Sequence, residues 1–157
     1  MSDEQFVKDF FLKNKADALV NLFALNDHVD SKRLSNKLMD IELSLFEKYL
    51  SVNITALFSV CREFARNNES GSIVNFTSTY GVGSPYPFLY KGGEKNIAYG
   101  VSKAAVIQLT KHLAVHLAPA VRVNCVLPGG VKYEQSWEFQ EKYSQLTPLG
   151  RMMNVKS

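Results

Sequence analysis

One helix pattern between two short β-branched runs constrains the fold of this chain more than any other feature. Residues 72–78 read SIVNFTS and residues 121–127 read VRVNCVL, so each run is about one strand long. Between them, residues 98–118 carry apolar side chains at helical spacing until Pro119, which cannot continue a helix. A strand, a helix and a second strand in this order form a right-handed crossover between parallel strands. The segment therefore predicts a parallel α/β sheet.

Further segments extend this pattern towards the N-terminus. Residues 18–24, ALVNLFA, form a continuous apolar run, as expected for a strand that is covered on both faces. Ser44 and Glu47 have the spacing of a capping box, and they open a helix pattern that continues to residue 66. A short amphipathic helix begins near residue 3, with Ser2 at its cap position. We therefore expect one α/β domain over residues 1–157, with about three parallel strands and flanking helices.

The composition excludes several kinds of partner. The 18 basic and 15 acidic side chains are scattered, without the basic cluster that a nucleic acid or a membrane surface would need. No apolar run in the sequence approaches the ~18 residues of a membrane span. Cys61 and Cys125 lie in apolar runs, as expected for buried thiols in a reducing compartment. His112 and His116 lack a third ligand, so we expect no metal. These features favour a cytoplasmic protein with a small-molecule partner.

Three polar residues fall where parallel sheets bind ligands. Ser78 ends the second predicted strand, and Tyr99 and Lys103 follow one helical turn apart after a loop rich in Gly, Pro and Tyr. Ligands bind beyond the carboxyl ends of such strands, so we expect the three side chains to face one crevice. An ammonium group near a phenol favours the ionised phenol. Lys103 should therefore lower the pKa of Tyr99 towards the working pH of an acid/base group.

Four segments in this order resemble the short-chain dehydrogenase/reductase family. They are Asn53 in SVNITALF, the serine strand GSIVNFTSTYG, the Tyr-x-x-x-Lys helix YGVSKAAV, and the strand and turn VRVNCVLPGGV. TPLGRM, residues 147–152, is similar to a later segment of the family. The resemblance covers roughly residues 16–152 and implies a partial doubly wound, Rossmann-like sheet.

The resemblance also implies an activity, which is hydride transfer between NAD or NADP and a hydroxyl or carbonyl of a small polar substrate. Tyr99 would exchange the proton, Ser78 would bind the substrate oxygen, and Lys103 would hold the nicotinamide ribose. Asn53 would anchor a water molecule that relays protons from Lys103. The implied cofactor contacts combine residues after two strands with the catalytic pair: Asn21, Ala24, Tyr99, Lys103, Pro128, Gly129 and Val131.

The sequence departs from the family at the cofactor's phosphate end. The glycines begin only at Gly71, and Gly81-x-Gly83 lacks the third glycine of a phosphate-binding loop. The residue that selects NAD or NADP would lie in the same missing half. Leu22 and Phe23 replace residues of the family's Asn-Asn-Ala-Gly motif, and a Phe there would crowd the cofactor ribose. These departures imply a fragment that holds the catalytic middle of the fold.

Two segments around the expected crevice leave alternatives open. The insertion SPYPFLYKGGEKN is similar to family members that act on sugar-type substrates in bacterial surface-glycan and flagellin modification. Its Lys91 and Lys95 either meet a phosphate or carboxylate or belong to a solvated loop. Trp137 and Phe139 either close over substrate as a lid or pack a short amphipathic helix.

Two hypotheses of function follow. In the first, the chain is part of an active oxidoreductase; in the second, it is an inactive remnant that serves as a dimerisation or interaction module. A glycine-rich loop encoded in frame upstream of Met1 would favour the enzyme. The family's helix pairing implies a homodimer through helices 44–66 and 98–118. We expect an outward apolar face on these helices that includes Val60, Phe64, Leu109 and Leu113.

Overall fold

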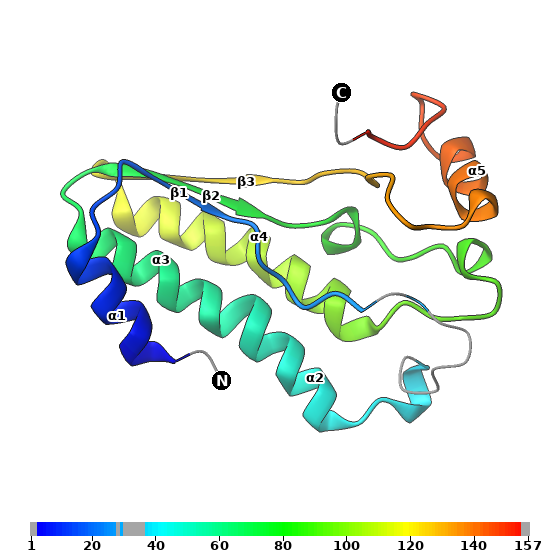
Figure 1. The fold of residues 1–157 in the computed structure, drawn as a ribbon, viewed down its shortest axis with the longest axis horizontal. Coiled ribbons are helices and arrows are strands. Elements are labelled where there is room, and N and C mark those ends of the chain that lie inside the picture. The colour runs from blue at the N-terminus through cyan, green and yellow to red at the C-terminus, as the bar shows by residue number, and fades with distance from the viewer. Residues whose placement is uncertain (1–2, 28, 30–36, 155–157) are drawn as a thin grey trace.

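The computed structural model describes residues 3–27, 29 and 37–154 of the chain (Figure 1). Its helices are α1 (Glu4–Lys13), α2 (Leu43–Leu50), α3 (Ala56–Asn67), α4 (Ile97–Leu117) and α5 (Trp137–Gln145), and its strands are β1 (Ala18–Asn21), β2 (Gly71–Phe76) and β3 (Val121–Val126). A π-helical turn, Ser51–Thr55, joins α2 to α3. Short 3-10 turns cover Leu38–Asp40, Thr79–Gly81 and Pro87–Tyr90. No helix within the described ranges is long and apolar enough to cross a membrane.

The sheet has the strand order β1-β2-β3, and both pairings are parallel. Asn21 of β1 pairs with Asn75 of β2, which in turn pairs with Cys125 of β3. The prediction of an α/β fold with a three-stranded parallel sheet is confirmed.

The helices lie along one face of this sheet, as Figure 1 shows for α1, α3 and α4. The opposite face carries exposed side chains such as Val20, which is 53% exposed, and Arg122. The prediction that strand 18–24 is covered on both faces is therefore wrong, because no helix of the described residues packs on the second face. The strand is also shorter than predicted and ends at Asn21.

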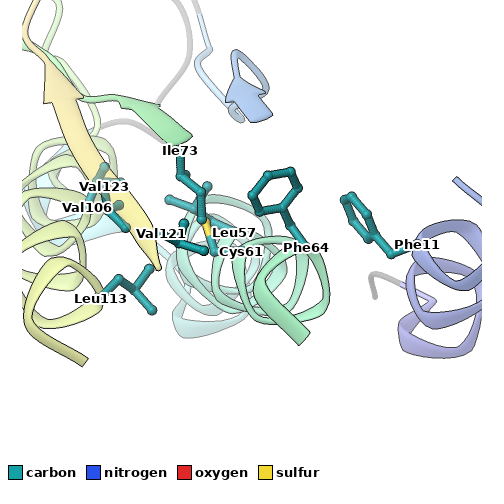
Figure 2. Close-up of a cluster of buried hydrophobic side chains, with 9 residues drawn as sticks. All are labelled: Phe11, Leu57, Cys61, Phe64, Ile73, Val106, Leu113, Val121 and Val123. Atoms are coloured by element: carbon teal, nitrogen blue, oxygen red, sulfur yellow. The ribbon is translucent and has the colours of Figure 1, made fainter. Parts of the chain in front are cut away.

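The hydrophobic core fills the space between the sheet and the helices, and it joins α1, α3 and α4 to β2 and β3 (Figure 2). Its members share almost complete burial: Phe11, Leu57, Cys61, Phe64, Ile73, Val106, Leu113, Val121 and Val123. The rings of Phe11 and Phe64 meet edge to face with centroids 6.1 Å apart, which fixes α1 against α3.

The predicted outward apolar face is wrong at two of its four residues. Phe64 and Leu113 are 0% and 8% exposed and belong to the core, because the sheet lies on their side of α3 and α4. Val60 and Leu109 are half-buried against the same core. The exposed apolar side chains of these helices are others, namely Phe58, Ile97, Val101 and Val115.

Two predicted helix caps also differ from the structure. The N-cap of α2 is Glu42, and the Ser44 hydroxyl donates to the Glu42 carboxylate rather than capping the helix. The helix therefore begins before the predicted capping box. Asp3 caps α1 by accepting a hydrogen bond from the Phe6 backbone N–H at 3.1 Å. Ser2, the predicted cap, lies outside the described residues.

Candidate active site

A pocket of about 700 Å³ opens beyond the carboxyl ends of β2 and β3. Five residues predicted for the site line it: Ser78, Tyr99, Pro128, Gly129 and Val131. Lys103, Asn53, Asn21 and Ala24 do not line it. The structure therefore divides the predicted set into residues that line the pocket and residues that do not.

Helix α4 positions Tyr99 and Lys103 one turn apart. The helix is capped by Asn96, whose side-chain oxygen accepts from the Ala98 N–H at 2.9 Å. The Thr77 hydroxyl donates to the Lys103 carbonyl at 2.6 Å, so the first turns of α4 are fixed to the end of β2. Ser78 follows Thr77 directly, and its side chain lies close enough to Tyr99 to lower the pKa of that phenol in part.

The approach of the two elements depends on Gly81. A Cβ atom at this position would lie 2.7 Å from the Thr77 hydroxyl and 2.8 Å from the Lys103 carbonyl group. Any side chain would therefore push the turn at Thr79–Gly81 away from α4. Gly81 therefore has a packing role in this structure.

The pKa of Tyr99 is raised, because burial penalises the phenolate more than the Ser78 hydrogen bond favours it. The sequence predicted the opposite direction, through Lys103. The Lys103 ammonium instead donates to the Phe76 carbonyl at 2.8 Å and lies 5.9 Å from the Tyr99 ring centroid. Burial also lowers the pKa of Lys103. Tyr99 is thus held as a neutral phenol, the form that donates a proton.

Asn53 lies in the π-helical turn between α2 and α3, and its side chain fixes the segment after β1. Its amide oxygen accepts from the Leu25 N–H at 2.7 Å, and its nitrogen donates to the Leu25 carbonyl at 3.1 Å. The same nitrogen donates to the Ser102 hydroxyl at 2.9 Å, which links this segment to α4. Single π turns occur often at functional sites, and nothing in the sequence marks this one.

Asn21 belongs to a buried polar chain that sequence reasoning missed. Its amide donates to the Asn75 oxygen at 2.9 Å, and the Asn75 amide donates to the Thr110 hydroxyl at 3.0 Å. The sequence did carry a signal for this chain, namely an Asn in each of two predicted apolar strands. A buried Asn side chain normally needs a hydrogen-bond partner. Ala24 and the neighbouring Phe23 are exposed.

The outer rim of the pocket is formed by residues 79–96 and by α5, and it is aromatic. The hydroxyls of Tyr80 and Tyr90 share a hydrogen bond, and the Tyr90 and Phe139 ring centroids lie 5.6 Å apart. The Tyr143 hydroxyl accepts from the Gly130 N–H. Sequence reasoning missed these three tyrosines as pocket residues, because their place at the pocket depends on contacts between segments that are distant in sequence.

Ion pairs hold α5 to the insertion. Glu138 pairs with both Lys91 and Lys142, and Lys142 also donates to the Phe88 carbonyl at 3.1 Å. Of the two aromatic residues in α5, Phe139 lines the pocket, whereas Trp137 is 74% exposed. Phe139 therefore both packs and borders the pocket.

The described residues contain no group of three His, Cys, Asp or Glu side chains that could hold a metal ion. His112 and His116 stack with ring centroids 6.3 Å apart on the exposed side of α4.

A parallel sheet with a pocket beyond its strand ends defines a Rossmann-like α/β protein, and comparisons with known proteins agree. A family model described as enoyl-(acyl carrier protein) reductase matches residues 4–157. Tropinone reductase-like 3 from Erythroxylum coca is 34% identical over 124 residues, which are 76% of this chain and 45% of that protein.

Two solved structures are also similar. A short chain dehydrogenase from Leptospira borgpetersenii with bound NAD+ has a TM-score of 0.77 at 30% identity, covering 97% of this chain and 60% of that chain. ElxO with NADP bound has a TM-score of 0.71 at 25% identity, covering 97% of this chain and 62% of that one. The chain belongs to the short-chain dehydrogenase/reductase family, and it spans less than two thirds of the length of these relatives.

The residues present fit one end of a dinucleotide. Gly129 is exposed at the pocket wall. A Cβ atom built on it would meet the Tyr143 hydroxyl first, at 3.5 Å. Because glycine has no side chain, a planar ring can approach the backbone at this position. No glycine-rich turn follows β1, where the chain reads LFALND. The nicotinamide end therefore fits the pocket, and these residues offer no cradle for the diphosphate.

Proposed function

We propose that this chain carries the catalytic part of an NAD(P)-dependent oxidoreductase that acts on a small polar substrate. The observation that carries the proposal is the meeting of Ser78, Tyr99 and Lys103 at the carboxyl end of β2, with Ser78 and Tyr99 facing one pocket. Bound nicotinamide would supply or accept the hydride. The residues expected to hold it are those predicted from the sequence: Asn21, Ala24, Tyr99, Lys103, Pro128, Gly129 and Val131.

Tyr99 is the proposed acid/base. Its raised pKa keeps the proton on the phenol, so it is ready to protonate a carbonyl oxygen that becomes a hydroxyl. Ser78 would donate a hydrogen bond to the same oxygen and stabilise its developing charge. Lys103 would hold the nicotinamide ribose and connect Tyr99 to a proton path that Asn53 helps to order.

Sugar-type substrates and a cytoplasmic location remain proposals. The aromatic rim formed by Tyr80, Tyr90, Phe139 and Tyr143 supports a sugar, because sugar rings pack well on aromatic faces. A homodimer through residues 44–66 and 98–118 is supported by exposed apolar side chains that differ from the predicted ones, Phe58, Ile97, Val101 and Val115. The free thiols of Cys61 and Cys125 are compatible with a reducing cytoplasm.

The alternative of an inactive interaction module is supported by the sheet face that no described helix covers. Titration of NADH and NADPH into the chain separates the two, with quenching of Trp137 and energy transfer to the reduced cofactor as readouts. The proposed enzyme binds one cofactor in the micromolar range, and Lys103→Ala weakens binding while Tyr99→Phe largely keeps it. A folded chain that binds neither cofactor up to millimolar concentration favours the module.

A further inference from the structure

Lys95 is a cation in the pocket wall, and none of the salt bridges within the described residues involves it. It lies in the loop before α4, and its ammonium donates to the Asn26 side-chain oxygen and, at 2.8 Å, to the Asp27 carbonyl. Both acceptors are neutral, and no carboxylate among the described residues forms an ion pair with Lys95. Burial outweighs the attraction of the more distant Asp27 carboxylate and lowers the pKa of Lys95 to about 8. A partly dry cation without a counter-ion is unfavourable, and an anionic ligand would relieve that cost.

The other cations near the pocket are already engaged. Lys91 and Lys142 both pair with Glu138 at the rim, and Lys103 lies behind the wall with its ammonium on the Phe76 carbonyl. Of the acidic residues that line the pocket, Asp27 accepts a hydrogen bond from the Tyr49 hydroxyl at 3.2 Å, and Glu134 is exposed. Lys95 is therefore the lining cation of the described residues that remains available to a ligand.

The position of Lys95 relates it directly to the proposed chemistry. Its ammonium lies over the Tyr99 ring, 4.7 Å from the ring centroid, and Ser78 lines the same pocket. An anion on Lys95 would therefore lie only a few bonds from a carbonyl held by Tyr99 and Ser78. The sequence left Lys95 as either an anion contact or part of a solvated loop, and its burial and hydrogen bonds argue against the solvated loop.

We propose that Lys95 binds the carboxylate of the substrate, so that the substrate class is a small oxo or hydroxy acid, sugar acids included, whose carbonyl or hydroxyl lies near its acid group. This inference rests on the proposed function, since it assigns Lys95 to the same pocket as Tyr99. The aromatic rim would then cover the carbon skeleton, while Lys95 and the Ser78–Tyr99 pair fix its two polar ends. Two fixed ends orient a small molecule much better than one.

The test compares an acid with its neutral counterpart, without any cofactor. Saturation-transfer NMR measures binding of 3-hydroxybutyrate and of 1,3-butanediol to the wild-type chain and to Lys95→Met, Lys95→Arg and Lys91→Met. We expect the acid to bind about tenfold or more tightly than the diol, because a charged hydrogen bond is lost in the diol. Lys95→Met should abolish that preference, whereas Lys95→Arg and the rim control Lys91→Met should keep it.

Equal binding of acid and diol to the wild type, or an unchanged preference in a folded Lys95→Met variant, would overturn the assignment. Inorganic phosphate is added as a competitor. If phosphate displaces both the diol and the acid and binds more tightly than the acid, the carboxylate assignment is overturned in favour of a phosphate ester. If Lys95→Met does not fold, the lysines of the wild-type chain are acetylated instead. Loss of the preference for the acid after acetylation would then support the role of Lys95. Lys95→Arg is the control, because its arginine is not acetylated and should keep the preference. Because no cofactor is present, failure here is distinct from failure of the cofactor titration.

Discussion

The floor of the pocket and its rim are built in opposite ways. The floor, made of β2, β3 and the first turns of α4, is fixed by buried neutral hydrogen bonds such as the one from the Thr77 hydroxyl to the Lys103 carbonyl. The rim, made of residues 79–96 and α5, is held by packed aromatic rings and by the partly exposed pairs of Glu138 with two lysines. Buried networks are rigid and exposed ion pairs are weak. The difference indicates that the floor carries the chemistry and the rim adapts to the substrate.

The largest expected effect concerns the reaction itself. Tyr99→Phe removes the proton donor of the floor and should lower the rate of hydride transfer about 10²- to 10⁴-fold. Tyr80→Phe removes a hydroxyl of the rim that bonds to Tyr90, so it should change the rate by less than about tenfold. The rate is measured as the loss of NADH or NADPH absorbance with a carbonyl substrate. Similar rates in the two variants would remove the distinction between floor and rim.

Stability should show the same contrast. Phe64 is fully buried in the core, and Phe64→Ala should lower the free energy of unfolding by about 3–5 kcal/mol. Phe88 is 48% exposed in the rim, and we expect Phe88→Ala to cost less than about 1 kcal/mol. Urea unfolding followed by circular dichroism measures both. A Phe88→Ala variant as unstable as Phe64→Ala would mean that the rim is part of the core.

A smaller effect tests the close approach of β2 and α4. Gly81→Ala places a methyl group 2.7 Å from the Thr77 hydroxyl, so overpacking should cost about 1–3 kcal/mol and displace the turn that carries Ser78. Gly83→Ala is the matched control, because its Cβ would meet only the Thr79 carbonyl at an ordinary 3.7 Å. Differential scanning calorimetry of both variants provides the measurement. Equal melting temperatures would show that the approach of these elements is not tight.

The last prediction concerns the titration of Lys95. Its pKa is lowered from 10.5 to about 8, so between these values the unfolded chain binds the proton that the folded chain has lost. The free energy of unfolding should therefore rise with pH across this window, and the cost should be fully present below pH 8. Among residues 3–27, 29 and 37–154, the charged and titratable groups that face Lys95 are Asp27 and Tyr99. NMR titration of the Lys95 side chain, with Lys95→Met as the assignment control, should give a midpoint near 8, and a midpoint near 10.5 would contradict this description.

The sequence predicts the floor better than the rim, for physical reasons. The strands and α4 follow from β-branched runs and helical spacing, and α4 begins and ends within one residue of the predicted bounds. Residues that depend on contacts distant in sequence were not predictable in detail. Examples are the raised pKa of Tyr99, which depends on burial, and the burial of Phe64 and Leu113, which depends on the side from which the sheet packs.

Hydrogen exchange on the intact chain, with and without NADH or NADPH, tests most directly whether the floor is a preformed nicotinamide site. We predict slow exchange in β2, β3 and α4 without cofactor, and faster exchange in α5 and in residues 79–96. Added cofactor should slow the amides of residues 76–81 and 129–131, and Lys103→Ala should prevent this change. Exchange in the floor as fast as in the rim, or no protection from either cofactor at millimolar concentration, would contradict the account.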